Sequence, residues 1–240
     1  MTREGGAPSI AVIGGGLTGL MTAAALSHAG PRVHLIDRAE SDAAHPDERT
    51  TTINAAGARM LAALGAWDRL ETPPAPVTRI AVAEGPAPTG LAARRRPDSD
   101  LSWQSGDAPM GYVVANAALQ SALRETLAAT NVIERRGCGV TGWSAGDTIS
   151  SLGLADAAGQ EETMEAALVV ACDGARSMMA ELAGLGRREE RQRQTAIVTT
   201  LRAERPHEGT AFQRFLPTGP FALMPGPGDA GGYEMSLVWT

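Results

Sequence analysis

The stretch from residue 10 to residue 38 limits the possible folds more than any other part of the chain. It opens with a short apolar run at 10–13, and a second apolar run at 33–36 ends on Asp37. Runs of this length without polar alternation are typical of strands buried in a parallel sheet. The segment between them, 18–29, has a helical composition and is stopped by a Gly-Pro pair. The order strand, helix, strand predicts a βαβ unit in an α/β fold.

Three glycines lie at the turn of this unit, in the pattern Gly14-x-Gly16-x-x-Gly19. Gly14 permits the tight turn, Gly16 leaves room for the pyrophosphate of a dinucleotide, and Gly19 lets the helix pack close to the strand. The free N–H groups and the dipole of the helix N-terminus favour a diphosphate. Asp37 would accept hydrogen bonds from an adenosine ribose. The pattern predicts a site for an adenine dinucleotide, and a glycine-rich turn that binds nothing is the alternative.

Composition sets the size of the core and argues against one class of partner. The chain has 240 residues, of which 43% are hydrophobic, which is enough for one large domain or two modest ones. The formal net charge of −6 argues against a general role in nucleic-acid binding. The basic runs at 94–96 and 187–188 are expected to be solvated loops, with contact to phosphate or lipid headgroups as the alternative.

Cysteine and histidine spacing predicts neither a metal site nor a redox centre. Cys138 and Cys172 lie outside any CxxC or Cys/His cluster, and Cys172 ends an apolar strand, so we expect a buried core thiol there. No ligand spacing is found among the four histidines, which are His28, His34, His45 and His207.

The sequence also bears on the expected location of the protein. Residues 1–9 are expected to be a loose leader, and they are not expected to be a signal peptide, because they lack its apolar core. No stretch approaches the roughly 20 apolar residues of a membrane helix. We therefore expect a cytoplasmic protein, with peripheral contact to a membrane left open.

Two further helices are expected. The segment 38–50 is predicted to be a loop over the nucleotide, followed by a helix over 53–64. Asn116 is a plausible N-cap for the second helix. The apolar stripe of that helix has the spacing of a core-facing surface and consists of Leu119, Leu123 and Leu127.

The remaining pattern is dominated by strands. A β-meander is expected over 138–171, and the apolar run 166–171 is expected to be a central strand. The segments 77–103 and 190–240 are predicted to pair with each other as a second, β-rich layer. The other expected strands are 77–83, 112–114, 132–133, 195–203, 210–216, 221–225 and 233–239.

Three polar groups could extend the dinucleotide site. Arg38 could lie beside the adenine or its 2′ region, with a surface salt bridge as the alternative. Arg49 could bind a diphosphate bidentately, although a solvated arginine is the simpler interpretation. Asp173-Gly174 follows a predicted central strand, and a carboxylate at that end of a strand lies where α/β sheets bind ligands.

Taken together, these motifs resemble the flavin-dependent aromatic hydroxylases, the class A flavoprotein monooxygenases. Within that family, the chain looks most like the ubiquinone-biosynthesis branch of polyprenyl-phenol and polyprenyl-methoxyphenol hydroxylases. The resemblance covers nearly the whole chain, and its most specific part is the late run 207–239. The segments that carry it are 49–57, 64–67, 113–116, 207–215, 219–225 and 236–239.

The resemblance implies a fold like that of para-hydroxybenzoate hydroxylase. A Rossmann-like FAD-binding domain would comprise 1–72 and 106–186, with a β-rich substrate domain over 73–105 and 187–240. Relatives are longer and carry a later Gly-Asp motif that meets the flavin, so the substrate domain is expected to be incomplete at its C-terminal side. Many relatives also have Arg where this chain has Ala180.

The resemblance also implies site residues. No side chain is expected to act as a catalytic acid, base or nucleophile, and no metal is expected. The expected cofactor-binding residues are Gly14, Gly16, Leu17, Thr18, Gly19, Asp37, Arg38, Arg49, Asn116, Asp173 and Gly174. The expected substrate-lining residues are Phe212, Phe215, Phe221, Met224 and Trp239, each with plain core as the alternative.

The implied activity is hydroxylation of a polyprenylated phenol by O₂ in ubiquinone biosynthesis. NAD(P)H or an electron-transfer protein would reduce FAD, and a C4a-hydroperoxide would transfer the hydroxyl group. Contact with a membrane surface or with a ubiquinone-biosynthesis complex would deliver the substrate. One alternative is a non-catalytic FAD-domain fragment or a scaffold subunit. Another is a different FAD/NAD(P)H oxidoreductase such as a prenyl reductase, against which the run 207–239 argues.

Overall fold

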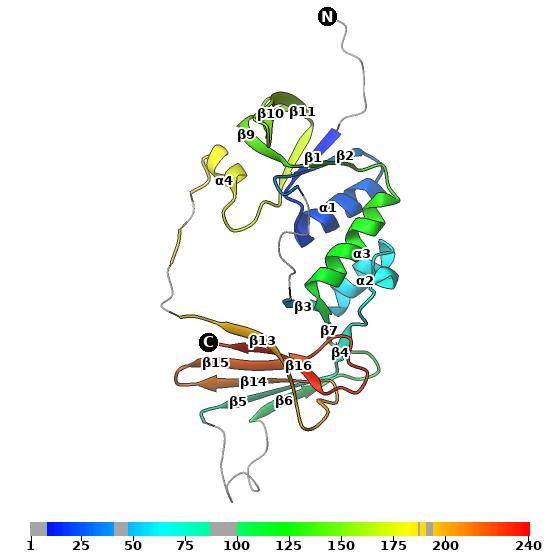
Figure 1. Cartoon of the computed structure of the whole chain (residues 1–240), viewed down its shortest axis with the longest axis vertical. Coiled ribbons are helices and arrows are strands. Elements are labelled where there is room, and N and C mark those ends of the chain that lie inside the picture. The colour runs from blue at the N-terminus through cyan, green and yellow to red at the C-terminus, as the bar shows by residue number, and fades with distance from the viewer. Residues whose placement is uncertain (1–8, 41–47, 87–99, 187, 191–193) are drawn as a thin grey trace, which may run out of the picture. The chain divides into compact units, whose positions relative to one another are not determined.

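The computed structural model describes residues 9–40, 48–86, 100–186, 188–190 and 194–240. The chain forms two compact units, each built from three segments of the sequence (Figure 1). The first unit comprises Met1–Pro46, Leu64–Arg69 and Gln120–Glu190, and the second comprises Asp47–Ala63, Leu70–Leu119 and Arg191–Thr240.

The first unit is built on a parallel four-stranded sheet. Its strands, in spatial order, are β12 (Leu168–Ala171), β1 (Ser9–Ile13), β2 (Arg32–Asp37) and β8 (Ile133–Arg136). Helix α1 (Leu17–His28) connects β1 to β2, so the predicted βαβ unit is confirmed. Side chains from all three elements are fully buried, among them Val12, Leu20 and Val33.

An antiparallel meander completes this unit. It consists of β9 (Cys138–Ser144), β10 (Ser150–Asp156) and β11 (Glu161–Ala166), followed later by the short helix α4 (Met178–Leu182). Leu152 and Leu154 are fully buried in a cluster that also contains Met179 of α4. The meander predicted from the sequence is therefore confirmed.

The prediction of one central strand over 166–171 is wrong. Ala166 ends β11, and β12 starts at Leu168 as the edge strand of the parallel sheet within the described residues. Between them, the N–H of Ala167 donates to the carbonyl of Ser9 at 2.8 Å, where the chain passes from one sheet to the other. An apolar run alone does not reveal that change of sheet.

A second correction concerns the start of the second unit. Strand β3 (Thr50–Asn54) occupies residues predicted to be the end of a loop and the start of a helix. Its β-branched residues favour an extended backbone, and it pairs with β7 (Gly111–Ala115). Helix α2 (Ala55–Ala63) begins afterwards, where the N–H of Gly57 donates to Asn54 Oδ1 at 2.8 Å.

The second unit contains two sheets. The smaller one has the order β3-β7-β4, with β4 at Ala75–Val77. The larger one has six strands in the order β13-β16-β15-β14-β5-β6 (Figure 1). Its strands are β5 (Arg79–Glu84), β6 (Leu101–Gln104), β13 (Ile197–Arg202), β14 (Thr210–Leu216), β15 (Gly219–Pro225) and β16 (Glu234–Trp239). Because β5 pairs with β14, the predicted pairing of 77–103 with 190–240 is confirmed.

Helix α3 (Asn116–Ala128) carries the predicted apolar stripe, and all three of its leucines are buried. The boundary between the two units falls within this helix. Residues 47–63 and 106–119 belong to the second unit by their contacts, because β3 and β7 pair there, whereas the sequence places them with the FAD-binding domain. A 3-10 turn, η2 (Trp67–Arg69), lies in the first unit.

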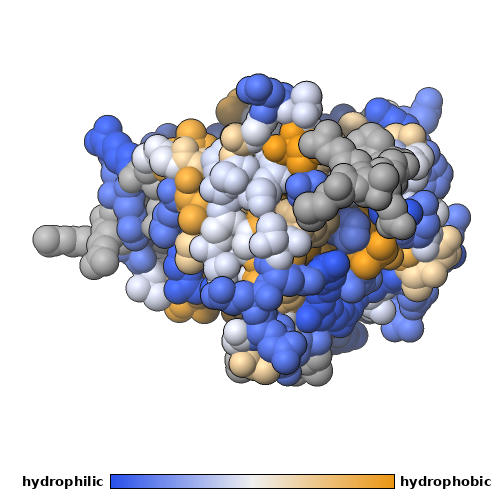
Figure 2. All heavy atoms as spheres, turned by 90° about the horizontal axis from the view of Figure 1, so that it is seen from above, coloured by the Kyte–Doolittle hydropathy of each residue, from blue (hydrophilic) through white to orange (hydrophobic). Residues whose placement is uncertain are grey.

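The surface shows how the apolar residues are distributed. On the face seen in Figure 2, hydrophobic residues form small patches separated by hydrophilic ones. In the part of the chain that the structure describes, no helix combines the length and the apolar character needed to cross a bilayer.

The buried meander core gives a first testable prediction. Leu154→Ala should lower the free energy of unfolding by about 2–5 kcal/mol, because it removes buried methyl groups and leaves a cavity. Leu185→Ala, at a side chain that is 67% exposed, should change it by less than about 0.5 kcal/mol. Urea unfolding followed by circular dichroism measures both, and equal losses would contradict the assigned core.

Candidate functional site

The turn after β1 is held by contacts that only glycine allows. Gly14 has a φ of +105°, and a Cβ there would lie 2.9 Å from the Cα of Asp173. Its N–H donates to the carbonyl of Ile36 at 2.8 Å. A Cβ on Gly19 would collide with the carbonyl oxygen of Gly14. Helix α1 therefore packs directly on the turn, as the sequence predicts.

Gly16 differs from these two, because a Cβ there would meet no atom within 4 Å. The residue is the N-cap of α1 and faces open space. The amides of Leu17, Thr18 and Gly19 in the first turn have no carbonyl four residues earlier within the helix to bond to, whereas the N–H of Leu20 donates to the carbonyl of Gly16 at 2.9 Å. This position therefore presents N–H groups to a ligand without a side chain in the way.

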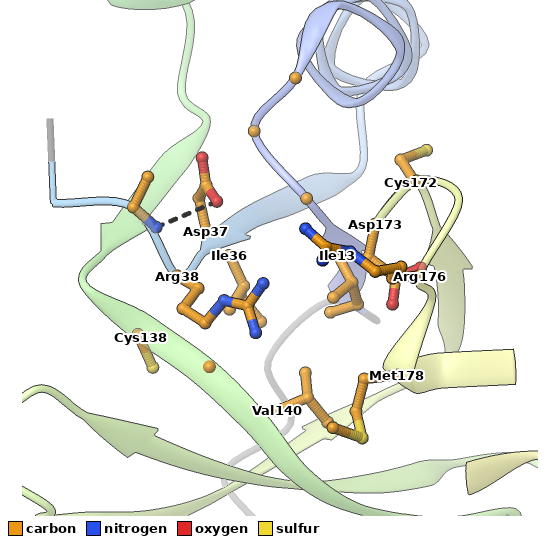
Figure 3. Close-up of a pocket in the computed structure, with 16 residues that line it drawn as sticks. Ile13, Ile36, Asp37, Arg38, Cys138, Val140, Cys172, Asp173, Arg176 and Met178 are labelled. Atoms are coloured by element: carbon orange, nitrogen blue, oxygen red, sulfur yellow. Dashed lines mark hydrogen bonds between the residues drawn. The ribbon is translucent and has the colours of Figure 1, made fainter. Parts of the chain in front are cut away.

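Gly15 is not part of the Gly-x-Gly-x-x-Gly motif, but the structure leaves little room for a side chain there. A Cβ on Gly15 would collide with the carboxylate of Asp37. That carboxylate accepts a hydrogen bond from the N–H of Ala39 at 3.2 Å (Figure 3). The middle glycine of the Gly14–Gly16 run thus leaves room for the acidic side chain that ends β2.

These elements surround a cavity of about 380 Å³ at the carboxyl ends of β1, β2 and β12. The side chains of Arg38 and Arg176 enter it from opposite sides (Figure 3). Its lining residues are Ile13, Gly14, Gly15, Gly16, Ile36, Asp37, Arg38, Ala39, Cys138, Gly139, Val140, Cys172, Asp173, Gly174, Arg176 and Met178. The structure therefore brings together the predicted residues Gly14, Gly16, Asp37, Arg38, Asp173 and Gly174.

Sequence reasoning missed one wall of this cavity. Gly139 and Val140 reach it from β9, and Arg176 and Met178 reach it from the turn into α4. A further arginine, Arg124 of α3, supports the turn by donating from Nη2 to the carbonyl of Gly15 at 3.4 Å. These residues have no motif of their own, since their position depends on how the meander and α3 pack.

Asp173 holds the start of α4. Its Oδ1 accepts the Ser177 hydroxyl at 2.6 Å, and its Oδ2 accepts the N–H of Met179 at 3.0 Å. Ser177 in turn caps the helix by accepting the N–H of Ala180 at 3.0 Å. Burial alone would raise the pKa of Asp173, but the hydrogen bonds from Met179 and Ser177 outweigh it and lower the pKa. The carboxylate is therefore charged and fixed in place at neutral pH.

The prediction that Cys172 is a buried core thiol is wrong. The residue is only half-buried and lines the cavity, with its Sγ 3.8 Å from the Thr22 hydroxyl. Cys138, by contrast, is buried, and burial together with the nearby Glu162 carboxylate raises the pKa of its thiol. Both cysteines are free.

Of the two basic runs predicted to be solvated loops, only Arg188 lies among the described residues. Arg188 is highly exposed and pairs with Glu190 at 2.6 Å, as expected for a solvated segment. Residues 94–96, Arg187 and His45 lie outside the described residues.

Two predicted cofactor residues belong to the second unit and do not line the cavity. The N–H of Asn116 donates to the carbonyl of Arg49 at 3.0 Å, and Asn116 Oδ1 accepts the Thr51 hydroxyl at 2.5 Å. These contacts join the end of β7 to the start of β3. A role for Arg49 or Asn116 in cofactor binding stays a prediction, as does a role for Leu17 and Thr18.

A second cavity, of about 220 Å³, lies within the second unit between its two sheets. Its walls combine amide and hydroxyl groups with apolar side chains, and consist of Thr52, Asn54, Val77, Ile80, Met110, Gly111, Ala211, Gln213 and Met224. Met224 is thus the one predicted substrate residue in the lining. Phe215 lies on the same face of the six-stranded sheet as Met224, because both alternate in register with Gln213 and Ala222.

The other three predicted substrate residues lie on the opposite face of that sheet. Phe221 pairs with Trp239 across β15 and β16, and Phe212 is two residues from the partner of Phe221. The rings of Phe221 and Trp239 meet edge to face, with their centroids 5.9 Å apart. The five residues therefore do not form one surface.

Comparison with known proteins agrees with this geometry. Residues 8–231 match the family described as FAD binding domain. A ubiquinone hydroxylase UbiL from Rhodospirillum rubrum is 37% identical over 238 residues, covering 96% of this chain and 51% of that protein. The 3-demethoxyubiquinol 3-hydroxylase of Escherichia coli is 28% identical, covering 90% of this chain and 54% of that protein. The chain thus spans about half the length of the curated relatives it matches.

Solved structures give the same fold. The p-nitrophenol 4-monooxygenase PnpA of Pseudomonas putida superposes with a TM-score of 0.73 at 20% identity, over 97% of this chain and 57% of that one. The chain shares this fold, and its cavity lies where a Rossmann-like domain binds a nucleotide. The chain belongs to the FAD-binding domain family, and FAD is the cofactor of this domain.

The cavity fits the adenosine diphosphate part of FAD. Amides at the start of α1 and the guanidinium groups of Arg38 and Arg176 offer donors for a diphosphate. The Asp37 carboxylate offers an acceptor for ribose hydroxyls. Open space before Gly16 allows the close approach that this binding needs.

The glycines give a prediction that separates binding from folding. Gly16→Ala should weaken FAD binding about tenfold or more, while changing the free energy of unfolding by less than about 1 kcal/mol, because its methyl group meets only the ligand space. Gly19→Ala should instead destabilise the protein, because its methyl group meets the Gly14 carbonyl. Flavin-fluorescence titration and thermal melts measure the two effects. Loss of stability in Gly16→Ala would contradict this assignment.

Asp173 gives a prediction about acid stability. A carboxyl group whose pKa is lowered by folding stabilises the folded state above its unfolded pKa and loses that contribution as the pH falls through the folded pKa. Asp173→Asn should therefore be less stable than the wild type at neutral pH and lose less stability between about pH 5 and pH 3. Urea midpoints across that range test this, with the exposed Asp147→Asn as a control that keeps the wild-type slope.

Proposed function

We propose that this chain provides the FAD site and part of the substrate site of a monooxygenase that hydroxylates a polyprenylated phenol in ubiquinone biosynthesis. The observation that carries the proposal is the cavity at the carboxyl ends of the parallel strands, with its glycine turn, Asp37 and two arginines. The hydroxylase names of relatives that match nearly the whole chain support the reaction class.

The residues of the first unit would bind and orient the cofactor. The start of α1, together with Arg38 and Arg176, neutralises the diphosphate, and Asp37 holds the ribose. When bound and reduced by NAD(P)H or an electron-transfer protein, FAD supplies the activation of O₂. The charged and hydrogen-bonded Asp173 fixes the turn that brings Arg176 to the cavity.

The cavity of the second unit would hold the phenol ring. Val77, Ile80 and Met224 give it apolar walls. Binding there would be favourable because it removes the apolar surface of an aromatic ring from water. The side-chain amide of Gln213 lies at its border and makes no hydrogen bond within the part of the chain that the structure describes. It can therefore donate a hydrogen bond to the phenol oxygen or accept one from the hydroxyl group. No side chain is required to transfer a proton to carbon.

The proposal predicts a substrate-dependent flavin reaction. The protein should bind FAD, and a short prenyl phenol should stimulate NAD(P)H oxidation and appear as a product with one more oxygen atom. Gln213→Leu should raise KM for the phenol about tenfold, as expected for one lost hydrogen bond, without weakening FAD binding. Absorbance at the nicotinamide band and mass spectrometry of the product follow both steps.

Two outcomes would contradict the proposal. Bound FAD without any effect of phenols on NAD(P)H oxidation would favour the non-catalytic FAD-domain alternative. Reduction of a prenyl double bond instead of ring hydroxylation would favour the prenyl reductase.

A further inference from the structure

One face of the six-stranded sheet carries a row of exposed apolar side chains. Cross-strand pairing places Gln213, Ala222, Val238 and Val198 in one row across β14, β15, β16 and β13. Val198 is 51% exposed and Val238 is 39% exposed. Phe215, which is 53% exposed, lies next to this row on the same face. Contiguous apolar surface of this kind marks a binding site in soluble proteins.

This row is continuous with the second cavity. The neighbouring row on the same face contains Ala211, Met224 and Ser236, and the first two line the cavity. Ser236 is covered, because its hydroxyl accepts the Thr50 hydroxyl at 3.1 Å from the smaller sheet. Gln213 belongs to both features, since it lies in the exposed row and also lines the cavity. The sheet face therefore passes from a covered pocket to an open apolar surface at Gln213.

The row is longer on one side of Gln213 than on the other. From Gln213 toward β13 it crosses three strands and contains Ala222, Val238 and Val198, none of which is charged. In the other direction it crosses two strands and contains Val82 and Leu101, and the next residue of β5 on this face is the charged Glu84. An extended uncharged chain is therefore favoured on the side of β15, β16 and β13.

The length of the row can be compared with that of a ligand. Three steps between neighbouring strands separate Gln213 from Val198, which is about 14 Å at a strand spacing of about 4.8 Å. With carbon–carbon bonds of about 1.5 Å, about three extended isoprene units cover that distance.

We infer that this row, here called the tail row (Ala222, Val238 and Val198), binds the isoprenoid tail of the substrate whose ring enters the cavity at Gln213. The inference rests on the proposed function for the identity of the ring. The tail runs across the strands of the sheet, and its first three isoprene units make the contacts. Contact with the tail row then selects substrates by tail length, while the cavity selects the ring.

Adjacent residues of β13 supply a matched pair of variants. Val198 lies in the tail row, whereas Ile197 pairs with Trp239 on the opposite face and is 55% exposed. Val198→Asp and Ile197→Asp therefore place the same charge on the same edge strand, at nearly equal exposure. Val198→Ala and Ile197→Ala form a milder pair in case the charged variants fail to fold.

The experiment measures binding to the FAD-loaded protein by calorimetry. The probes are phenol carrying no, one, two or three isoprene units, and farnesol, which has the tail without the ring. The wild type should bind about three- to tenfold more tightly with each isoprene unit, as expected from the added apolar area. Val198→Asp should lose the gain from the third unit and bind farnesol at least fivefold more weakly, with unchanged affinity for phenol that carries one unit. Ile197→Asp should match the wild type within twofold.

Several results would overturn the inference. These are affinity independent of tail length, equal losses in the two aspartate variants, or no binding of farnesol by the wild type. A concentration-dependent dimer that Val198→Asp dissociates, without any effect of tail length, would assign this face to a second copy of the chain instead. Retained, Val198-dependent farnesol binding without hydroxylation of any phenol would leave the tail row standing while the proposed function fails.

Discussion

The close approach of the Gly14–Gly19 turn to its neighbours is the contact on which the first site depends. Gly19 lies against the carbonyl of Gly14, and Gly14 lies against the chain at Cys172 and Asp173. Because no side chain separates them, the N-terminus of α1, the end of β1 and the end of β12 meet at one point. Helix N–H groups, the acidic end of β2 and the turn into α4 then face the same cavity. A side chain at Gly14 or Gly19 would therefore displace the N–H donors of α1 from the ligand without changing any charge.

The charge distribution around the cavity follows from that geometry. Hydrogen bonds from α4 hold Asp173 in its charged form, but they also occupy its oxygen atoms. The carboxylate thus organises the turn that carries Arg176, so that two arginines and a helix N-terminus present positive potential to the ligand. Asp37, beside Gly15, remains the acidic group at the cavity's other edge. This arrangement separates a region suited to phosphate from a region suited to sugar hydroxyls.

Local sequence patterns predicted those parts of the fold whose contacts are close in sequence. The βαβ unit, the meander and the helix with Leu119, Leu123 and Leu127 follow from apolar periodicity and turn residues. The predictions that were wrong concern segments whose structure depends on partners distant in the sequence. Strand β3 forms because β7 lies beside it, and the run at 166–171 divides where Ala167 bonds to Ser9. The same reason explains why Gly139, Val140 and Arg124 could not be assigned to the site from sequence, since no motif records which strand or helix packs beside the glycine turn.

The aromatic residues of the larger sheet show how strongly a site depends on strand alternation. Phe212, Phe221 and Trp239 are expected to line the substrate site because they are aromatic, but the strand register places them on one face of the sheet. Met224 and Gln213 line a cavity on the other face. A shift of one residue would reverse these faces, so register rather than composition decides which side chains meet a ligand. The edge-to-face pair of Phe221 and Trp239 consequently stabilises the packing of β15 on β16. On the face that carries the cavity, small and aliphatic residues such as Ala222 and Val238 leave the surface open. A flat aliphatic surface next to a small polar-edged pocket suits a molecule with one compact ring and one long flexible chain.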